Sequence, residues 1–276
     1  WEWLPKPGYA AAAVRVACAV LGIGASYKGD VLGEEQWRWL EAELRNSTAS
    51  AHLIVSSIQV LTTSPAVESW GHFPAARVRL LELLRDTAPA GALLLSGDVH
   101  YAELIGNTGR SEEGGGLLEV TSSGINRACG GSLRGAMGRL FCEAFVSLWH
   151  RHRLPEASAR RPRADERRRG SPLSMSAEWL GAAVTDDNTG TISIEPAHGQ
   201  EWGELRARVH DAEGEVLLEA RLTLGLGATA APRRWSRALD ELPGIWDEGR
   251  RIRALAGTML VLVLTRRLYT RRRWGW

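Results

Sequence analysis

A carboxylate and an imidazole stand two residues apart directly after an apolar run. Residues 92–96 have the composition of a buried strand, and Gly97 turns the chain into Asp98 and His100. A strand that ends in such a turn presents a carboxylate oxygen and an imidazole nitrogen at the carboxyl edge of a sheet, where divalent metals bind this pair of donors. Two ligands do not complete a site, so the same residues also fit a solvated turn or a satisfied polar pair.

Helices and strands alternate around this turn. Residues 33–45 have the spacing of an amphipathic helix with acidic residues in its first turn, and a second helix is expected from Pro74. Residues 52–60 are β-branched and almost uninterrupted, which predicts a strand covered on both faces, and residues 117–120 predict another short strand. This alternation indicates a layered α/β fold.

The second half of the chain is more varied. Residues 133–149 have the pattern of an amphipathic helix, and residues 151–169 hold eight arginines with three acids, which indicates an exposed, disordered insertion. A basic tract can also bind nucleic acid, but this one lacks interleaved aromatic residues. Residues 189–194 and 204–210 alternate with period two, and Gly214 turns the chain into an antiparallel hairpin with residues 216–224.

Composition excludes few functions and favours none. The net charge is +2, so the chain as a whole does not attract nucleic acid or an anionic membrane. The three cysteines share no metal-type spacing and do not indicate a compartment. The chain begins with Trp1, which suggests an excerpt or a broken gene model, and no secretion signal opens it. Residues 10–24 are apolar enough to imitate a signal core, but an alanine-rich segment interrupted by Arg15 more often forms a strand or helix packed inside.

The tail combines apolar and basic residues. Residues 254–264 form an apolar stretch that is too short to span a bilayer as a straight helix, and arginines and tryptophans follow it. This pattern fits weak membrane association through residues 253–276, and it fits a poorly ordered tail equally well.

Five segments form an ordered series of motifs, which include Trp70-Gly71-His72-Phe73-Pro74 and Gly97-Asp98-Val99-His100-Tyr101. The full set comprises residues 32–40, 53–60, 70–77, 95–103 and 119–124. In this order they resemble the C-terminal part of PhoD-like alkaline phosphatases, a branch of the metallophosphoesterase superfamily, and weaker likeness continues to about residue 225. The resemblance implies an α/β fold of the αββα sandwich type. This chain would form the C-terminal half of that sandwich and would end it with an antiparallel β-hairpin. It gives a phosphatase domain over residues 1–225, with the insertion near 150–170, and a tail over residues 226–276.

The resemblance also implies an activity and a site. It implies hydrolysis of phosphate monoesters or diesters of small molecules, with two divalent or trivalent metal ions such as iron, zinc, manganese or calcium. Asp98 and His100 match the family's closing metal-binding motif. Nucleic acid is not an expected partner, and the family suggests an extracellular or membrane-associated location.

Other residues are weaker candidates by the same comparison. Gln59 stands where related enzymes place a histidine ligand, or else it is structural. His72 and Arg127 are candidates to contact the substrate, and Arg127 stands where relatives often have a histidine. Tyr101 can cap the site or pack beneath it.

The family's other ligands come from earlier segments that this chain lacks. The chain alone is therefore expected to be inactive. The alternative hypothesis is a degenerate relative with a structural or membrane-associated role.

Overall fold

The structure is a computed structural model of the whole chain. It describes residues 7–106, 117–126, 128–129, 140, 142–146, 183–195, 202–225 and 244–274. The predicted basic insertion at residues 151–169 and most of the predicted helix at residues 133–149 lie outside these ranges, although residues 142–146 are helical.

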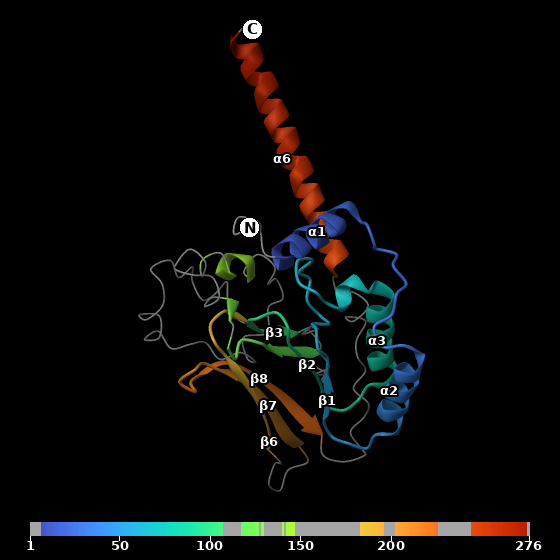
Figure 1. Cartoon of the computed structure of the whole chain (residues 1–276). Helices are drawn as coiled ribbons and strands as arrows, with labels where there is room; N and C mark the ends of the chain where they lie inside the picture. The colour runs from blue at the N-terminus through green and yellow to red at the C-terminus, as the bar shows by residue number, and fades with distance from the viewer. Residues whose placement is uncertain are drawn as a thin grey trace.

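A five-stranded mixed sheet lies at the centre of the molecule (Figure 1). Its strand order is β1-β2-β4-β3-β5, in which β1, β2 and β4 are parallel and β3 is antiparallel to both β4 and β5. The strands are β1 (His52–Val55), β2 (Ala92–Ser96), β3 (Ala102–Gly106), β4 (Leu118–Ser122) and β5 (Ala183–Val184). The short apolar runs predicted for β2 and β4 are confirmed as central strands.

A second, antiparallel sheet packs against the first. It contains β6 (Thr189–Glu195), β7 (Trp202–His210) and β8 (Val216–Gly225) in sequence order. The predicted hairpin is confirmed, with a turn at residues 211–214 and a register shift between Val209 and His210. These strands form a sheet of their own and do not extend the first one.

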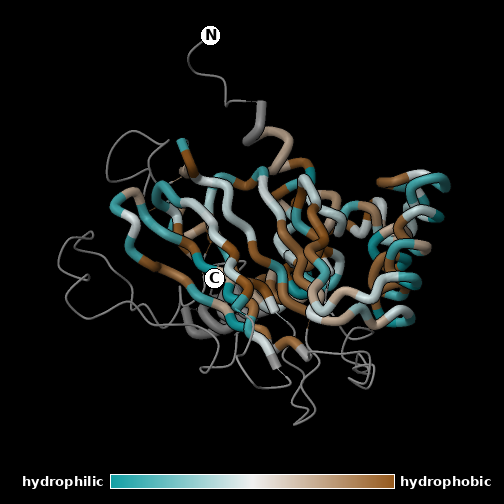
Figure 2. The backbone as a smooth tube through the Cα atoms, turned by 90° about the horizontal axis from the view of Figure 1, so that it is seen from below, coloured by the Kyte–Doolittle hydropathy of each residue, from teal (hydrophilic) through white to brown (hydrophobic). Residues whose placement is uncertain are grey.

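Period-two alternation in the central strands builds a core on each face of the first sheet. On β4, Leu118 and Val120 face the second sheet, where they join Leu205, Ala207 and other buried residues of β7 and β8. The opposite face packs against helices, through a cluster that includes Trp37. Figure 2 shows these apolar stretches meeting inside the molecule, with hydrophilic residues along the outer helices and turns. The described residues thus form three layers, and the fourth layer of an αββα sandwich stays a prediction.

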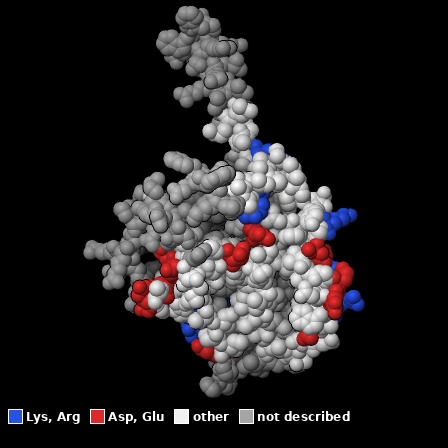
Figure 3. Space-filling model, in the orientation of Figure 1, with Lys and Arg blue, Asp and Glu red and all other residues white. Residues whose placement is uncertain are grey.

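Two helices cover the outer face of the first sheet. They are α2 (Glu34–Asn46), whose predicted range is confirmed, and α3 (Pro74–Thr87), which begins at Pro74 as predicted and follows the short 3-10 helix η1 (Trp70–His72). Leu80, Leu81 and Leu84 form the buried stripe of α3, whereas Val78 is exposed. Figure 3 shows basic and acidic side chains interspersed along this flank of the molecule.

The remaining helices cross near the top of the view in Figure 1. Helix α1 (Pro7–Leu21) packs against the base of α6 (Ile245–Trp274), which then projects away from the body. The expectation of an element packed inside is wrong for most of α1, because Ala19 is its only buried residue among those whose burial is described. The tail is helical through residue 274.

The predicted strand at residues 52–60 is too long. β1 ends at Val55, and the Ser56 hydroxyl donates to the Ile58 carbonyl in the bend that follows. Both faces were expected to be covered, but β1 is an edge strand and the Val55 side chain is 76% exposed. Local sequence does not distinguish an edge strand from a central one. It also did not mark the end of the strand, because strand-like residues continue into the buried loop that follows.

Candidate functional site

The carboxyl ends of the parallel strands meet at one edge of the first sheet. The loop after β1 contains Ser57, the turn after β2 contains Gly97, and the loop after β4 contains Ser123. A Cβ atom added to Gly97 would lie 3.8 Å from the Ser57 carbonyl oxygen and 3.9 Å from Ser123 Oγ, so the three segments converge around this glycine. In open α/β sheets this is the edge at which ligands bind.

Asp98 and His100 lie at this edge in an unusual backbone conformation. Their φ angles are 73° and 61°, which place both residues in the left-handed region, and both side chains are exposed. Aspartate and histidine tolerate this region better than most residues, but it is still unfavourable and persists only where the surroundings impose it. Such residues cluster at active sites and ligand-binding turns. The two predicted ligands are thus displayed to solvent by a strained turn.

The backbone of His100 is held from two sides. Its N–H donates to Ser123 Oγ at 3.3 Å, and its carbonyl oxygen accepts from the Cys129 N–H at 2.7 Å. The Ser123 loop is itself held by Asn188, whose N–H donates to the Gly124 carbonyl at 3.2 Å and whose Oδ1 accepts from Ser122 Oγ at 3.0 Å. These contacts hold the His100 main chain, from which the imidazole projects.

Gln59 lies inside the protein, next to the ends of β2 and β4. Its amide nitrogen donates to Glu103 Oε2 at 2.8 Å and to Thr121 Oγ1 at 3.0 Å. The Thr121 hydroxyl also lies 2.8 Å from that of Ser96. The Gln59 Oε1 atom is buried and has no hydrogen-bond partner among the described residues. The amide therefore takes part in a buried polar network, and metal binding by Gln59 stays a prediction.

A buried carboxylate that sequence reasoning missed organises the loop after β1. Glu119 of β4 is fully buried and accepts from the Val60 N–H at 2.8 Å and the Leu61 N–H at 2.6 Å. Burial raises its pKa above the usual value, and the two backbone donors only partly oppose this shift. Arg77 of α3, also buried, donates to the Val60 carbonyl at 2.8 Å. The sequence signal that could have indicated this buried carboxylate is a glutamate between the apolar residues of a strand.

Tyr101 is buried beneath the turn. It belongs to a small cluster with Cys142, Val146 and Ala183, against which Val99 and Cys129 also pack. Burial, and then the charge of Glu103, raise the pKa of the Tyr101 phenol well above its usual value, so it stays neutral at physiological pH. This position fits packing, and a role in capping the site stays a prediction.

The two remaining candidates are not brought to the Asp98 turn by any described contact. His72 ends η1, and its Nε2 lies 3.0 Å from the Val67 carbonyl oxygen. Burial lowers the pKa of His72, so the neutral imidazole is favoured. Arg127 lies outside the described residues. Substrate binding by either residue stays a prediction.

No complete metal site is formed by the residues that the structure describes. Within those ranges, no three histidine, cysteine, aspartate or glutamate side chains are grouped so that they could hold a metal ion. Asp98 and His100 offer one oxygen and one nitrogen donor, a pair that suits iron, zinc or manganese. They fit a metal as two ligands of a larger set.

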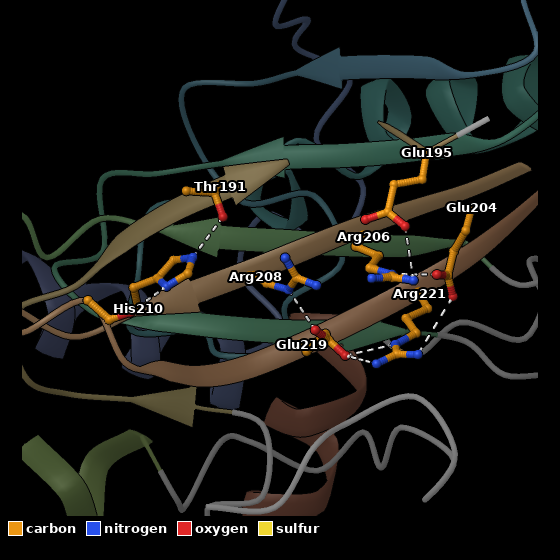
Figure 4. A network of polar contacts seen from close by, with 9 residues as sticks. Thr191, Glu195, Glu204, Arg206, Arg208, His210, Glu219 and Arg221 are labelled. Atoms are coloured by element: carbon orange, nitrogen blue, oxygen red, sulfur yellow. Dashed lines mark hydrogen bonds and ion pairs between the residues drawn. The ribbon is translucent and has the colours of Figure 1, made fainter. Parts of the chain in front are cut away.

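Arginines on the second sheet are paired with carboxylates (Figure 4). Glu219 lies between Arg208 and Arg221, with nitrogen–oxygen distances of 2.6 and 2.5 Å. Arg206 pairs with Glu195 and Glu204. Because each guanidinium has carboxylate partners, this network is read as cross-strand stabilisation of β6, β7 and β8 and not as a phosphate site.

Comparison with known proteins identifies the segment that contains this turn. A model of the family described as PhoD-like phosphatase matches residues 22–144. Over these residues the chain is similar to that family. A solved structure titled "Structure of PhoD" aligns with 15% identity and a TM-score of 0.34, and the alignment covers 83% of this chain and 42% of that chain. The chain thus spans less than half the length of that protein. A comparison with curated proteins found no match.

Proposed function

We propose that this PhoD-like chain forms part of a metal-dependent phosphoesterase in which Asp98 and His100 are metal ligands. The observation that carries the proposal is the strained turn after β2. Asp98 and His100 both adopt left-handed backbone angles, both side chains are exposed, and both lie within the matched segment. A solvated turn without a function would gain nothing from two residues in an unfavourable backbone region, one of which, His100, is held by hydrogen bonds on both sides of its main chain.

The chemistry of the donors suits phosphate-ester hydrolysis. Asp98 would bind a metal through a carboxylate oxygen and His100 through a neutral imidazole nitrogen. A bound metal, when present, would neutralise phosphoryl charge and acidify a bound water molecule. The chain's own contribution is to hold both donors in position at the sheet edge. The remaining ligands would come from outside the described residues. The four-layer sandwich and the two-metal centre belong to this same proposal.

An oxidising compartment fits the cysteine chemistry. Cys129 and Cys142 form a disulfide with a Cα–Cα distance of 6.0 Å, and Cys18 is a free thiol. Disulfides persist in exported proteins and are rare in reducing compartments. We therefore propose an extracellular location, which can be tested by fractionating cells that express the chain and labelling its thiols before and after reduction.

Helix α6 supports weak membrane association. Leu255, Met259 and Leu260 are about 60% exposed. The Thr258 hydroxyl donates to the Ala254 carbonyl and so leaves this stretch without an unpaired polar side chain. Arginines flank residues 254–264 in the sequence. Among the described residues, none of the helices combines the length and apolar character needed to cross a bilayer. At a membrane surface the arginines would contact anionic headgroups, and the apolar stretch would be buried at shallow depth.

A non-catalytic relative is the second candidate function. It is favoured by the lack of a three-ligand group among the described residues. The two candidates differ in metal binding, because a degenerate relative has no reason to retain affinity at Asp98 and His100.

The test measures metal binding and hydrolysis in the longest product of the gene. Mn²⁺ and Zn²⁺ affinities and the turnover of p-nitrophenyl phosphate and bis-p-nitrophenyl phosphate are compared for the wild type, Asp98→Asn and His100→Ala. Asp86→Asn serves as the matched control, because Asp86 is an exposed aspartate on α3. Each site variant should weaken metal binding by at least about 10- to 100-fold, the loss seen even for outer partners of metal ligands. Wild-type affinity and turnover in both site variants would exclude the proposal.

A further inference from the structure

We propose that the Cys129–Cys142 disulfide positions the His100 turn, an inference that rests on the function proposed above. The Cys129 N–H donates to the His100 carbonyl at 2.7 Å, the shorter of the two hydrogen bonds that hold the His100 backbone. Cys129 lies beyond β4, so this bond joins the turn to a segment from another part of the chain. The disulfide fixes that segment in turn.

Packing places the disulfide directly beneath the turn. Cys142 is buried with Tyr101, and Val99 and Cys129 pack against the same cluster. Both sequence neighbours of His100 are therefore held in this cluster, while the His100 side chain itself is exposed. The covalent bond between Cys129 and Cys142 crosses the cluster and restrains the neighbours of His100 without occupying the metal-binding face.

The left-handed backbone explains why such a restraint is needed. A histidine at a φ angle of 61° returns to the favoured negative region unless its surroundings prevent it. The other contact holding the Cys129 segment is weaker, since the Ala128 N–H lies 3.3 Å from Asp187 Oδ1. Breaking the disulfide should free Cys129, release the His100 carbonyl and let the His100 backbone leave its left-handed conformation. Cys129 and Cys142 act here as positioning residues, because neither would contact the metal or the substrate.

The experiment compares the longest product of the gene in the oxidised form, after reduction with a phosphine that is then removed, and as the Cys129→Ser/Cys142→Ser double variant. Cys18→Ser is the matched control, because it removes the free thiol and leaves the disulfide intact. The probe is Mn²⁺ alone, with affinity measured by the loss of the free-ion electron paramagnetic resonance signal. Reduction and the double variant should each weaken binding by about 10- to 100-fold, as for loss of an outer partner of a metal ligand, and Cys18→Ser should bind as the wild type does.

A second measurement separates this inference from the proposed function. Amide hydrogen exchange of the metal-free protein should become faster at residues 98–101 on reduction, while β7 keeps its protection. If the oxidised wild type fails to bind Mn²⁺, the proposed metal site is wrong, and exchange alone decides the positioning role. The inference would be overturned by unchanged exchange at residues 98–101 or by unchanged affinity in the double variant. It would also be overturned by loss of protection throughout β7, because the disulfide would then support the whole fold.

Discussion

Two glycines of α6 allow a matched test of how that helix is attached. A Cβ atom at Gly249 would lie 2.0 Å from the Ala19 carbonyl oxygen and 2.4 Å from the Ala19 carbonyl carbon, both backbone atoms of α1. At Gly257, the same added atom would meet nothing within 4 Å. Replacing either glycine by alanine improves helix propensity by about 1 kcal/mol. At Gly249 the gain is opposed by overpacking, which costs about 1–3 kcal/mol because backbone must move.

The difference between the two variants isolates the contact between α1 and α6. Gly257→Ala should be as stable as the wild type or up to about 1 kcal/mol more stable, whereas Gly249→Ala should be less stable than Gly257→Ala by about 1–3 kcal/mol. Urea unfolding followed by circular dichroism and by tryptophan fluorescence gives both free energies of unfolding. Equal stability of the two variants would show that α1 and α6 do not approach as closely as the structure places them, and the attachment of α6 would have to be revised.

Three further predictions concern the sheet edge, η1 and the tail. Gly124→Ala should lower the free energy of unfolding by about 1–3 kcal/mol, because the new Cβ would lie 2.1 Å from Asn188 Nδ2. In urea unfolding, Gly124→Ala should destabilise the protein less when Asn188→Ala is already present. Equal destabilisation in both backgrounds would contradict the clash. Burial lowers the pKa of His72 below 6.5, so the folded protein binds fewer protons than the unfolded chain. Its stability contribution is therefore complete above pH 6.5 and declines as the pH falls through 6.5 towards the folded pKa; in thermal melts across this range His72→Gln should flatten the decline, and an equally steep curve would refute the assignment. The chain should sediment together with vesicles rich in phosphatidylglycerol. Salt should weaken this binding by about 1 kcal/mol for each basic residue at the membrane surface, and Leu260→Glu should also weaken it. Equal binding to neutral vesicles would argue against contact with anionic headgroups.

Local periodicity was sufficient to predict most secondary structure. The spacing of apolar residues in α2 and the strict alternation in β7 each reflect one buried face, which is a property of the element and its nearest layer. The end of β1 was beyond this reasoning. Ile58 and Val60 continue the alternation expected of a strand, yet the N–H groups of Val60 and Leu61 donate to the Glu119 carboxylate and not to a neighbouring strand. That partner is distant in the sequence, so no window of neighbouring residues contains it.

The candidate site was predictable only as a pair of donors. Asp98 and His100 are informative because of their types and spacing after a strand, but the contacts that hold the His100 backbone come from Ser123 and Cys129, which are distant in the sequence. The pairing of Cys129 with Cys142 was equally inaccessible, since three cysteines without a metal-type spacing do not define which two are joined.

The position of the strained turn explains how a chain with so few ligands can still present an organised site. Strain at Asp98 and His100 must be offset by contacts elsewhere, and those contacts come from the loop after β4, from the Cys129 segment and from the cluster that buries Tyr101. None of these supports depends on a metal. In the proposed metal site the His100 backbone would therefore be held in place before any metal binds, and residues from outside the described ranges would only have to supply further ligands to this edge. This is why the affinity of Asp98 and His100 for a metal ion, and not catalytic turnover, is the more direct measure of what this chain contributes.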